Sequence, residues 1–191
     1  MNTEYGISLK MKEKINMEKL FDYNIFLIGF MGAGKSTIAG YLSRNYGMKT
    51  VEMDQIIAER EQMSISDIFR LHGEEYFRRL ETRLLNEMQS TDNTVISCGG
   101  GVPMREVNVQ AMKKNGMVVL LDAKPETILE RVRNSHDRPL LENRKNVESI
   151  AELMEQRRPK YEAAADIRVA TDGRSAGEIC EDLIRRLRQA E

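Results

Sequence analysis

The chain has 191 residues, and its 29 basic and 30 acidic side chains leave a formal net charge of −1. This length suits one domain with a sheet between helix layers. A nucleic-acid-binding domain usually carries a basic excess, and no apolar run approaches the roughly 20 residues that span a bilayer, so we expect neither nucleic acid nor a membrane as a partner.

The first 19 residues are polar and rich in lysine, and they contain Met11 and Met17. They lack the apolar core of a secretory signal. We expect a flexible leader over residues 1–20, or sequence upstream of a later natural start, followed by a single domain over residues 21–191.

A phosphate-binding loop follows the first predicted strand, residues 24–28. The string reads Gly29-Phe30-Met31-Gly32-Ala33-Gly34-Lys35-Ser36-Thr37, and a helix is predicted directly after it, over residues 36–45. A glycine-rich turn between a strand and a helix lets backbone N–H groups and the helix N-terminus surround phosphates. In this motif Lys35 reaches the outer phosphates and the Ser36 hydroxyl holds Mg²⁺. The sequence therefore predicts that the chain binds a nucleoside triphosphate.

Strands and helices alternate through the rest of the chain. The apolar pattern predicts further strands at residues 49–53, 94–98, 117–121 and 167–170. It predicts helices at residues 55–62, 64–69, 73–89, 106–115, 125–133, 147–164 and 175–189, with a bend or break at Pro159. This alternation predicts a three-layer α/β/α fold with a five-stranded parallel sheet. Residues 134–146 are charged and without apolar periodicity, which is typical of a mobile surface segment.

Ligands of open parallel sheets bind beyond the carboxyl ends of the strands. The second strand ends at Glu52 and Asp54, so one carboxylate can face the metal beside Ser36 and the other an acceptor hydroxyl. The third strand leads into Gly99, Gly100 and Gly101. Because three glycines cost backbone entropy and nothing in the sequence indicates a packing purpose, we interpret them as a place where a ligand contacts the main chain.

Arginines supply the cations that phosphoryl transfer needs. Four lie in or beside the mobile segment: Arg131, Arg133, Arg138 and Arg144. Arg78 and Arg157 lie on helices that flank the predicted pocket, where their planar guanidinium groups would suit a carboxylate on the acceptor.

The chain resembles the shikimate kinases from about Asn24 to its C-terminus. The matching pieces are the phosphate loop, Glu52-Met53-Asp54, Phe77-Arg78-Arg79-Leu80-Glu81, Gly99-Gly100-Gly101, Arg138-Pro139-Leu140-Leu141 and Arg157-Arg158-Pro159-Lys160-Tyr161. The resemblance implies a nucleoside-monophosphate-kinase-like fold with a mobile lid at about residues 134–147. It also implies transfer of the ATP γ-phosphate to the 3-hydroxyl of shikimate, in the pathway to chorismate and the aromatic amino acids, by a monomeric enzyme with one Mg²⁺ ion.

The resemblance also implies roles for individual residues. The catalytic residues would be Lys35, Asp54 and Arg138. ATP would be bound by Gly32, Ala33, Gly34, Lys35, Ser36, Thr37, Arg131, Arg138 and Arg174, with Arg131 stacking on the adenine. Shikimate would be bound by Asp54, Arg78, Gly99, Gly100, Gly101 and Arg157, and Mg²⁺ by Ser36 and Glu52.

Two points stay open in the sequence. The family usually has Asp-x-Asp after the second strand, and Glu52 replaces the first acid, so we expect altered metal geometry with activity retained. Two alternatives to the function remain. One is a kinase of the same fold acting on another hydroxy acid such as gluconate, and the other is a catalytically silent nucleotide-binding module.

The isolated Cys98 and Cys180 lack metal-ligand spacing and favour a reducing, cytoplasmic location.

Overall fold

The computed structural model describes residues 19–133 and 146–190, and its centre is a five-stranded parallel sheet. The strands lie in the order β2-β3-β1-β4-β5. Their bounds are β1 Asn24–Ile28, β2 Lys49–Glu52, β3 Thr94–Ser97, β4 Gly116–Asp122 and β5 Ile167–Ala170. The predicted five-stranded parallel sheet is confirmed.

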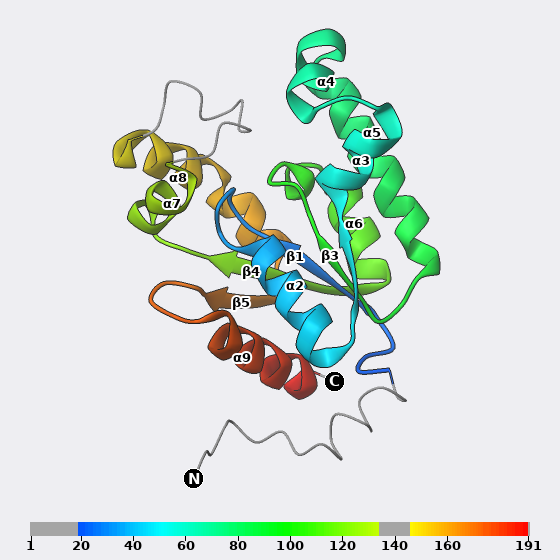
Figure 1. Cartoon of the computed structure of the whole chain (residues 1–191), viewed down its shortest axis with the longest axis vertical. Coiled ribbons are helices and arrows are strands. Elements are labelled where there is room, and N and C mark those ends of the chain that lie inside the picture. Colours follow the sequence, from blue (N-terminus) through cyan, green and yellow to red (C-terminus); the bar gives the residue numbers. More distant parts are fainter. Residues whose placement is uncertain (1–18, 134–145, 191) are drawn as a thin grey trace.

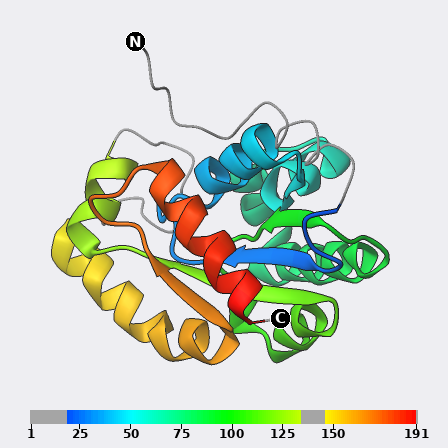
Figure 2. The same ribbon diagram turned by 90° about the horizontal axis from the view of Figure 1, so that it is seen from below.

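Helices cover both faces of this sheet (Figures 1 and 2). Their bounds are α2 Lys35–Tyr46, α3 Met53–Glu61, α4 Ile65–His72, α5 Glu74–Glu87, α6 Glu106–Lys114, α7 Pro125–Val132, α8 Val147–Ala164 and α9 Ala176–Gln189, with 3₁₀ turns η1 Met88–Ser90 and η2 Val102–Met104. Helices α2 and α9 pack together on one face, and α6 and α8 lie on the other. Helices α3, α4 and α5 form a group beside the β2 edge, and α5 also contacts α6. None of the described helices is long and apolar enough to cross a membrane.

The central strand β1 carries the middle of the hydrophobic core. Ile25, Phe26, Leu27 and Ile28 are all fully buried, because β1 has a hydrogen-bonded neighbour on each side and a helix layer above and below. A strand buried on both faces has a continuous apolar run without alternation, as this segment does. The chain leaves β1 toward β2 at one edge and later crosses to β4 on the other side, so the phosphate loop lies where the strand order reverses.

Several predicted boundaries differ in the structure. Strand β2 stops at Glu52 and helix α3 begins at Met53, so Asp54 lies in the first helical turn and not at a strand end. Helix α5 ends at Glu87 and tightens into η1 before the predicted end.

Of the bend or break predicted at Pro159, the break is wrong, because α8 runs through this residue as one helix. Pro159 lies on the exposed side of α8, where water can satisfy the carbonyl that proline leaves unpaired.

Candidate active site

The phosphate loop has the backbone shape that its glycines predict. Gly32 and Gly34 have φ angles of 80° and 103°, in the region that side chains disfavour. A Cβ at Gly32 would also lie 2.7 Å from Cγ1 of Val132 on α7. The Lys35 ammonium donates to the carbonyls of Gly29 and Phe30 at 2.9 and 3.1 Å. The lysine therefore lies across its own loop, with its charge over the anion site.

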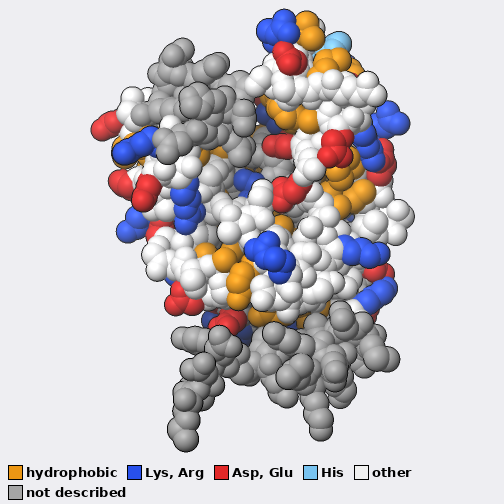
Figure 3. All heavy atoms as spheres, viewed as in Figure 1, with side chains coloured by type: hydrophobic (Ala, Val, Ile, Leu, Met, Phe, Trp, Pro, Cys, Tyr) orange, Lys and Arg blue, Asp and Glu red, His pale blue; other side chains and the backbone are white. Residues whose placement is uncertain are grey.

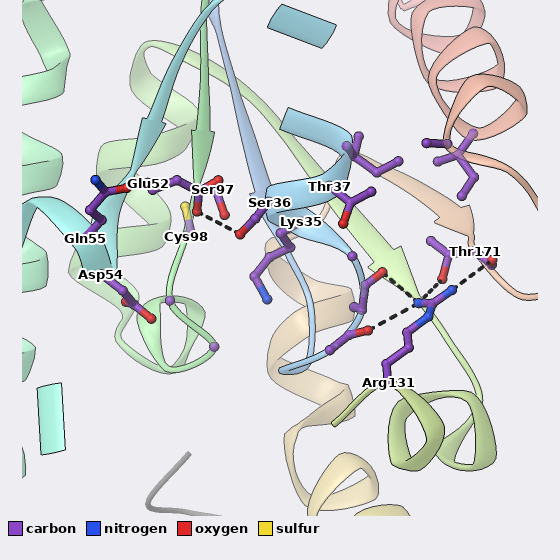
Figure 4. Close-up of a pocket in the computed structure, with 18 of the residues that line it drawn as sticks. Lys35, Ser36, Thr37, Glu52, Asp54, Gln55, Ser97, Cys98, Arg131 and Thr171 are labelled. Atoms are coloured by element: carbon purple, nitrogen blue, oxygen red, sulfur yellow. Dashed lines mark hydrogen bonds between the residues drawn. The ribbon is translucent and has the colours of Figure 1, made fainter. Parts of the chain in front are cut away.

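Ser36 and Glu52, the two predicted metal ligands, lie in contact beside this loop. The Ser36 hydroxyl donates to Oε2 of Glu52 at 2.9 Å (Figure 4). No cluster of three or more acidic, histidine or cysteine side chains suited to a metal occurs within residues 19–133 and 146–190. Mg²⁺ in kinase sites usually keeps several waters and phosphate oxygens and takes one or two protein oxygens. A hydroxyl and a carboxylate in contact fit that ion, and the longer Glu52 side chain does reach the serine.

A cavity of about 690 Å³ extends from the loop along the carboxyl ends of the strands. The predicted residues that line it are Gly32, Ala33, Gly34, Lys35, Ser36, Thr37, Glu52, Asp54, Gly99, Gly100, Arg131 and Arg174. In Figure 4 Lys35 lies between Asp54 on one side and Arg131 on the other. Figure 3 shows the surface hollowed beside the α3–α5 group, with acidic and basic side chains of the described residues interspersed on that face. The fold thus places most of the predicted site in one cavity.

Gly99, Gly100 and Gly101, the glycine segment, lie between β3 and η2. Added Cβ atoms would lie 2.8 Å from Oδ1 of Asp54 at Gly99 and 2.1 Å from Nη1 of Arg78 at Gly101. The prediction that these glycines have no packing purpose is therefore wrong. Two of them leave space for the very side chains that were predicted to bind the acceptor.

Arg78 is buried and already paired with carboxylates of its own helix. Its guanidinium donates to Glu81 at 2.8 Å and to Glu74 at 2.8 and 3.1 Å. The Glu81 side chain is fully buried, whereas that of Glu74 is 57% exposed. An incoming carboxylate can therefore displace Glu74 at little cost, while Glu81 keeps the guanidinium in place.

Burial raises the pKa of Glu81 to about 7, although the neighbouring Arg78 opposes the shift. The second oxygen of Glu81, Oε1, is buried without a hydrogen-bond partner among the described residues. It faces the Cα of Gly99, where an added Cβ would lie 2.6 Å away. The sequence motif contained Glu81, but no role was predicted for it, because nothing in a helix pattern distinguishes a buried glutamate from an exposed one.

Asp54 and Arg157 reach the glycine segment from opposite elements, α3 and α8. Oδ1 of Asp54 and Nη1 of Arg157 are buried and lack hydrogen-bond partners among the described residues. A Cβ at Gly100 would lie 3.8 Å from that Arg157 nitrogen, and the guanidinium carbon lies 5.9 Å from the centre of the Phe30 ring. Buried polar atoms without partners are uncommon in native proteins, so an unpaired acceptor and an unpaired donor beside a cavity indicate a polar ligand.

Arg131 joins the phosphate loop to β5. Its guanidinium donates to the carbonyls of Gly32 and Ala33 at 3.2 and 3.3 Å and to both oxygens of Thr171 at 3.3 and 3.4 Å (Figure 4). Thr171 is buried and accepts these bonds at the end of the cavity away from the glycine segment. Thr171 is a lining residue for which no role was predicted, because a threonine after a strand carries no motif.

Arg174 follows in the loop between β5 and α9 and lines the same end of the cavity. It donates to the carbonyl of Ala170 at 3.0 Å, to Asp182 at 3.1 Å and to the carbonyl of Glu178 at 2.8 Å. These contacts hold its planar group in one orientation.

Not every predicted residue lines the cavity. Gly101 lies just beyond its lining, and so do Arg78 and Arg157, which pack against the glycine segment. Arg138, the predicted catalytic arginine, lies outside the described residues, as do most of the predicted lid at 134–147 and residues 1–18 of the predicted leader. The roles of the site residues, including the described ones, stay predictions.

Comparison with known proteins agrees with this arrangement. A sequence model of the shikimate kinase family matches residues 31–188. The chain is 43% identical over 168 residues to a shikimate kinase of Dehalococcoides mccartyi, covering 88% of this chain and 95% of that protein. It is 44% identical over 165 residues to a shikimate kinase of Persephonella marina, covering 86% of this chain and 99% of that protein.

A solved structure has the same fold over most of its length. The shikimate kinase of Acinetobacter baumannii in complex with shikimate is 30% identical, with a TM-score of 0.83 over 88% of this chain and 94% of that chain. With a family match over most of the sequence and a phosphate loop, carboxylates and arginines arranged around one cavity, the chain belongs to the shikimate kinase family.

Proposed function

We propose that this protein transfers the γ-phosphate of ATP to the 3-hydroxyl of shikimate and releases shikimate 3-phosphate and ADP. The observation that carries the proposal is the glycine segment. Oδ1 of Asp54 lies near Gly99 and Nη1 of Arg157 near Gly100, both atoms lack a hydrogen-bond partner among the described residues, and these glycines line the same cavity as the phosphate loop. A carboxylated polyol has the acceptor and donor groups that these side chains lack.

ATP is proposed to lie with its phosphates in the loop and its base between Arg131 and Arg174. Backbone N–H groups of residues 32–37 and the Lys35 ammonium would bind the phosphates. Mg²⁺, held by Ser36 and Glu52, would neutralise charge on the phosphate oxygens. Arg138 is proposed to stabilise the charge that develops on the transferring group, the kind of role that contributes several powers of ten where an arginine supplies it.

Shikimate is proposed to lie against the glycine segment. Arg157, and Arg78 once Glu74 is displaced, would bind its carboxylate, and the glycine backbone would bind a ring hydroxyl. Asp54 would take the proton of the 3-hydroxyl as that oxygen bonds to the γ-phosphorus and the bond from phosphorus to the β–γ bridging oxygen breaks. A cytoplasmic monomer working in the pathway to chorismate belongs to the same proposal.

The direct experiment couples ADP release to NADH oxidation with ATP, Mg²⁺ and either shikimate, gluconate or AMP as acceptor. We expect turnover with shikimate alone, because the family match favours it over gluconate. Turnover with gluconate or AMP and none with shikimate would contradict the proposal. No turnover with any acceptor, with ATP still bound, would favour the silent nucleotide-binding module.

Asp54→Asn tests the acceptor side on its own. Loss of the proton acceptor should lower kcat by about two to four powers of ten, while the Kd for ATP stays within about twofold because Asp54 contacts the acceptor. Steady-state kinetics and calorimetric titration with ATP check both values. Glu59→Gln, an exposed carboxylate on the same helix α3, is the control and should keep full activity. An equal loss of ATP affinity in Asp54→Asn would show that Asp54 serves the nucleotide.

A further inference from the structure

Helix α8 presents two side chains to the glycine segment, one turn apart. Arg157 and Tyr161 are four residues apart, so they lie on the same side of the helix. Arg158 and Lys160 are exposed. The proposed function gives Arg157 a role, whereas Tyr161 lines no part of the main cavity.

Tyr161 is tied to the glycine segment by a short hydrogen bond. Its hydroxyl donates to the carbonyl of Gly100 at 2.6 Å, between groups 61 residues apart in the chain. The side chain is 5% exposed, so water competes little for this bond. A Cβ at Gly100 would lie 3.6 Å from the tyrosine oxygen and 3.8 Å from Nη1 of Arg157. The backbone of Gly100 therefore packs against both side chains of α8.

Helix α8 also packs against η2, the turn that directly follows the glycine segment. Strand β3 ends at Ser97, and within the turn the N–H groups of Val102 and Met104 bond back to the carbonyls of Gly99 and Gly101 at 3.1 Å. These bonds shape the turn but do not join it to α8. The Tyr161 hydroxyl adds a hydrogen bond from α8 to the glycine backbone itself, and the Arg157 side chain lies within hydrogen-bonding reach of the same hydroxyl. Tyr161 therefore helps to set the distance between the glycine backbone and Nη1 of Arg157.

We propose that Tyr161 is a positioning residue for the acceptor. Its hydroxyl holds the Gly100 carbonyl, and with it the backbone of the glycine segment, at the spacing from Arg157 that the acceptor carboxylate and hydroxyl require. The inference rests on the proposed function for the identity of the acceptor. Displacements of a fraction of an ångström in such a frame are enough to weaken binding.

Tyr161→Phe removes the hydroxyl and leaves the ring, so the packing of α8 is kept. In the protein without ligands, hydrogen–deuterium exchange at residues 99–104 should become about three- to tenfold faster. The loss of one neutral hydrogen bond shifts an opening equilibrium by a factor of this size. The KM and Kd for shikimate should rise by the same factor, while kcat and the Kd for ATP stay within about twofold.

Tyr76→Phe is the matched control. Tyr76 also donates its hydroxyl to an oxygen, Oε2 of Glu61 at 2.7 Å, but this hydrogen bond joins α5 to α3. We expect exchange at residues 99–104 and the KM for shikimate to be unchanged in this variant. A thermal melt of each variant confirms that the assay temperature lies below unfolding.

The outcomes separate the two proposals. Faster exchange at residues 99–104 with a selective rise in the shikimate KM supports the inference. Unchanged exchange, or an equal loss of ATP affinity, overturns it. If the wild-type protein does not phosphorylate shikimate, the proposed function fails, and the exchange experiment still decides whether Tyr161 holds the glycine segment.

Discussion

At the scale of single residues, the buried pair of Arg78 and Glu81 controls the charge behind the acceptor site. Arg78 neutralises Glu81 on one oxygen, and the other oxygen faces Gly99 near Asp54. Burial holds the pKa of Glu81 at about 7, against an ordinary value of 4.5. The carboxyl therefore changes its protonation near neutral pH, where ordinary glutamates are fully ionised.

This pKa predicts a pH-dependent stability. The folded protein keeps a proton on Glu81 up to about pH 7, whereas the unfolded chain releases it near 4.5. Because the folded state binds more protons between these values, the Glu81 contribution to the free energy of unfolding falls as pH rises through this window, by at most about 3 kcal/mol. Urea denaturation from pH 4.5 to 8 should show this fall in the wild type and a flatter profile in Glu81→Gln.

The control is Glu130→Gln, an exposed carboxyl on α7, which should reproduce the wild-type profile. Parallel profiles for the wild type and Glu81→Gln would show that Glu81 is ionised throughout the range.

At the scale of elements, helix α9 fixes the loop that carries Arg174. Asp182 on α9 is buried and accepts from Arg174 at 3.1 Å, from Arg186 at 2.9 Å and from Arg185. The hydrogen bond from Arg186 lowers the pKa of Asp182, and that from Arg174 acts in the same direction. The acid therefore stays ionised, and the arginine at the nucleotide end of the cavity has a fixed partner.

Asp182→Asn should weaken binding of the ATP base without affecting its phosphates. The neutral side chain loses the charge-assisted bond to Arg174, so we expect the Kd for ATP to rise about three- to tenfold. Binding of inorganic triphosphate should be unchanged, because the phosphate loop is formed by other elements. Calorimetric titration with each ligand measures both.

Glu181→Gln, the exposed neighbour on α9, serves as the control and should bind both ligands normally. Equal loss of ATP and triphosphate affinity in Asp182→Asn would contradict the role given to Arg174.

At the scale of the whole molecule, strand β1 holds the two halves of the sheet together. It pairs with β3 on one side and β4 on the other, and Phe26 at its centre is fully buried. Gly116 on β4 leaves space for this ring, since a Cβ there would lie 2.7 Å from Cε2 of Phe26. The same strand ends in the phosphate loop, so the stability of the core and the position of the site depend on one element.

Phe26→Ala should lower the free energy of unfolding by about 3–5 kcal/mol, the loss typical of a large aromatic removed from a core. Guanidinium denaturation followed by far-UV circular dichroism measures the change. Val107→Ala, at a position 50% exposed, should change stability by less than about 0.5 kcal/mol. A similar small loss in both variants would show that the core rearranges to fill the space left by Phe26.

Much of the architecture could be predicted from the sequence because its signals are local. The apolar run of β1 and the glycines of the phosphate loop each act within a few residues, and the structure confirms their positions. The order of strands and helices followed from the same periodicity. The boundary at Asp54 was wrong, because a helix that starts directly after a strand leaves no turn signal in the sequence.

The sequence by itself determined that a phosphate loop lies between a strand and a helix, and which carboxylates and arginines accompany it. The tertiary structure alone decided which side chains gather at the glycine segment and in what state. Arg78 is held by a buried Glu81, one buried atom each of Asp54 and Arg157 lacks a hydrogen-bond partner, and Tyr161 is bonded to Gly100. These contacts join elements far apart in the chain, and burial sets the pKa of Glu81. Periodicity and spacing in the sequence predict neither these long-range contacts nor the pKa of Glu81, because side-chain direction and desolvation arise only when the layers pack.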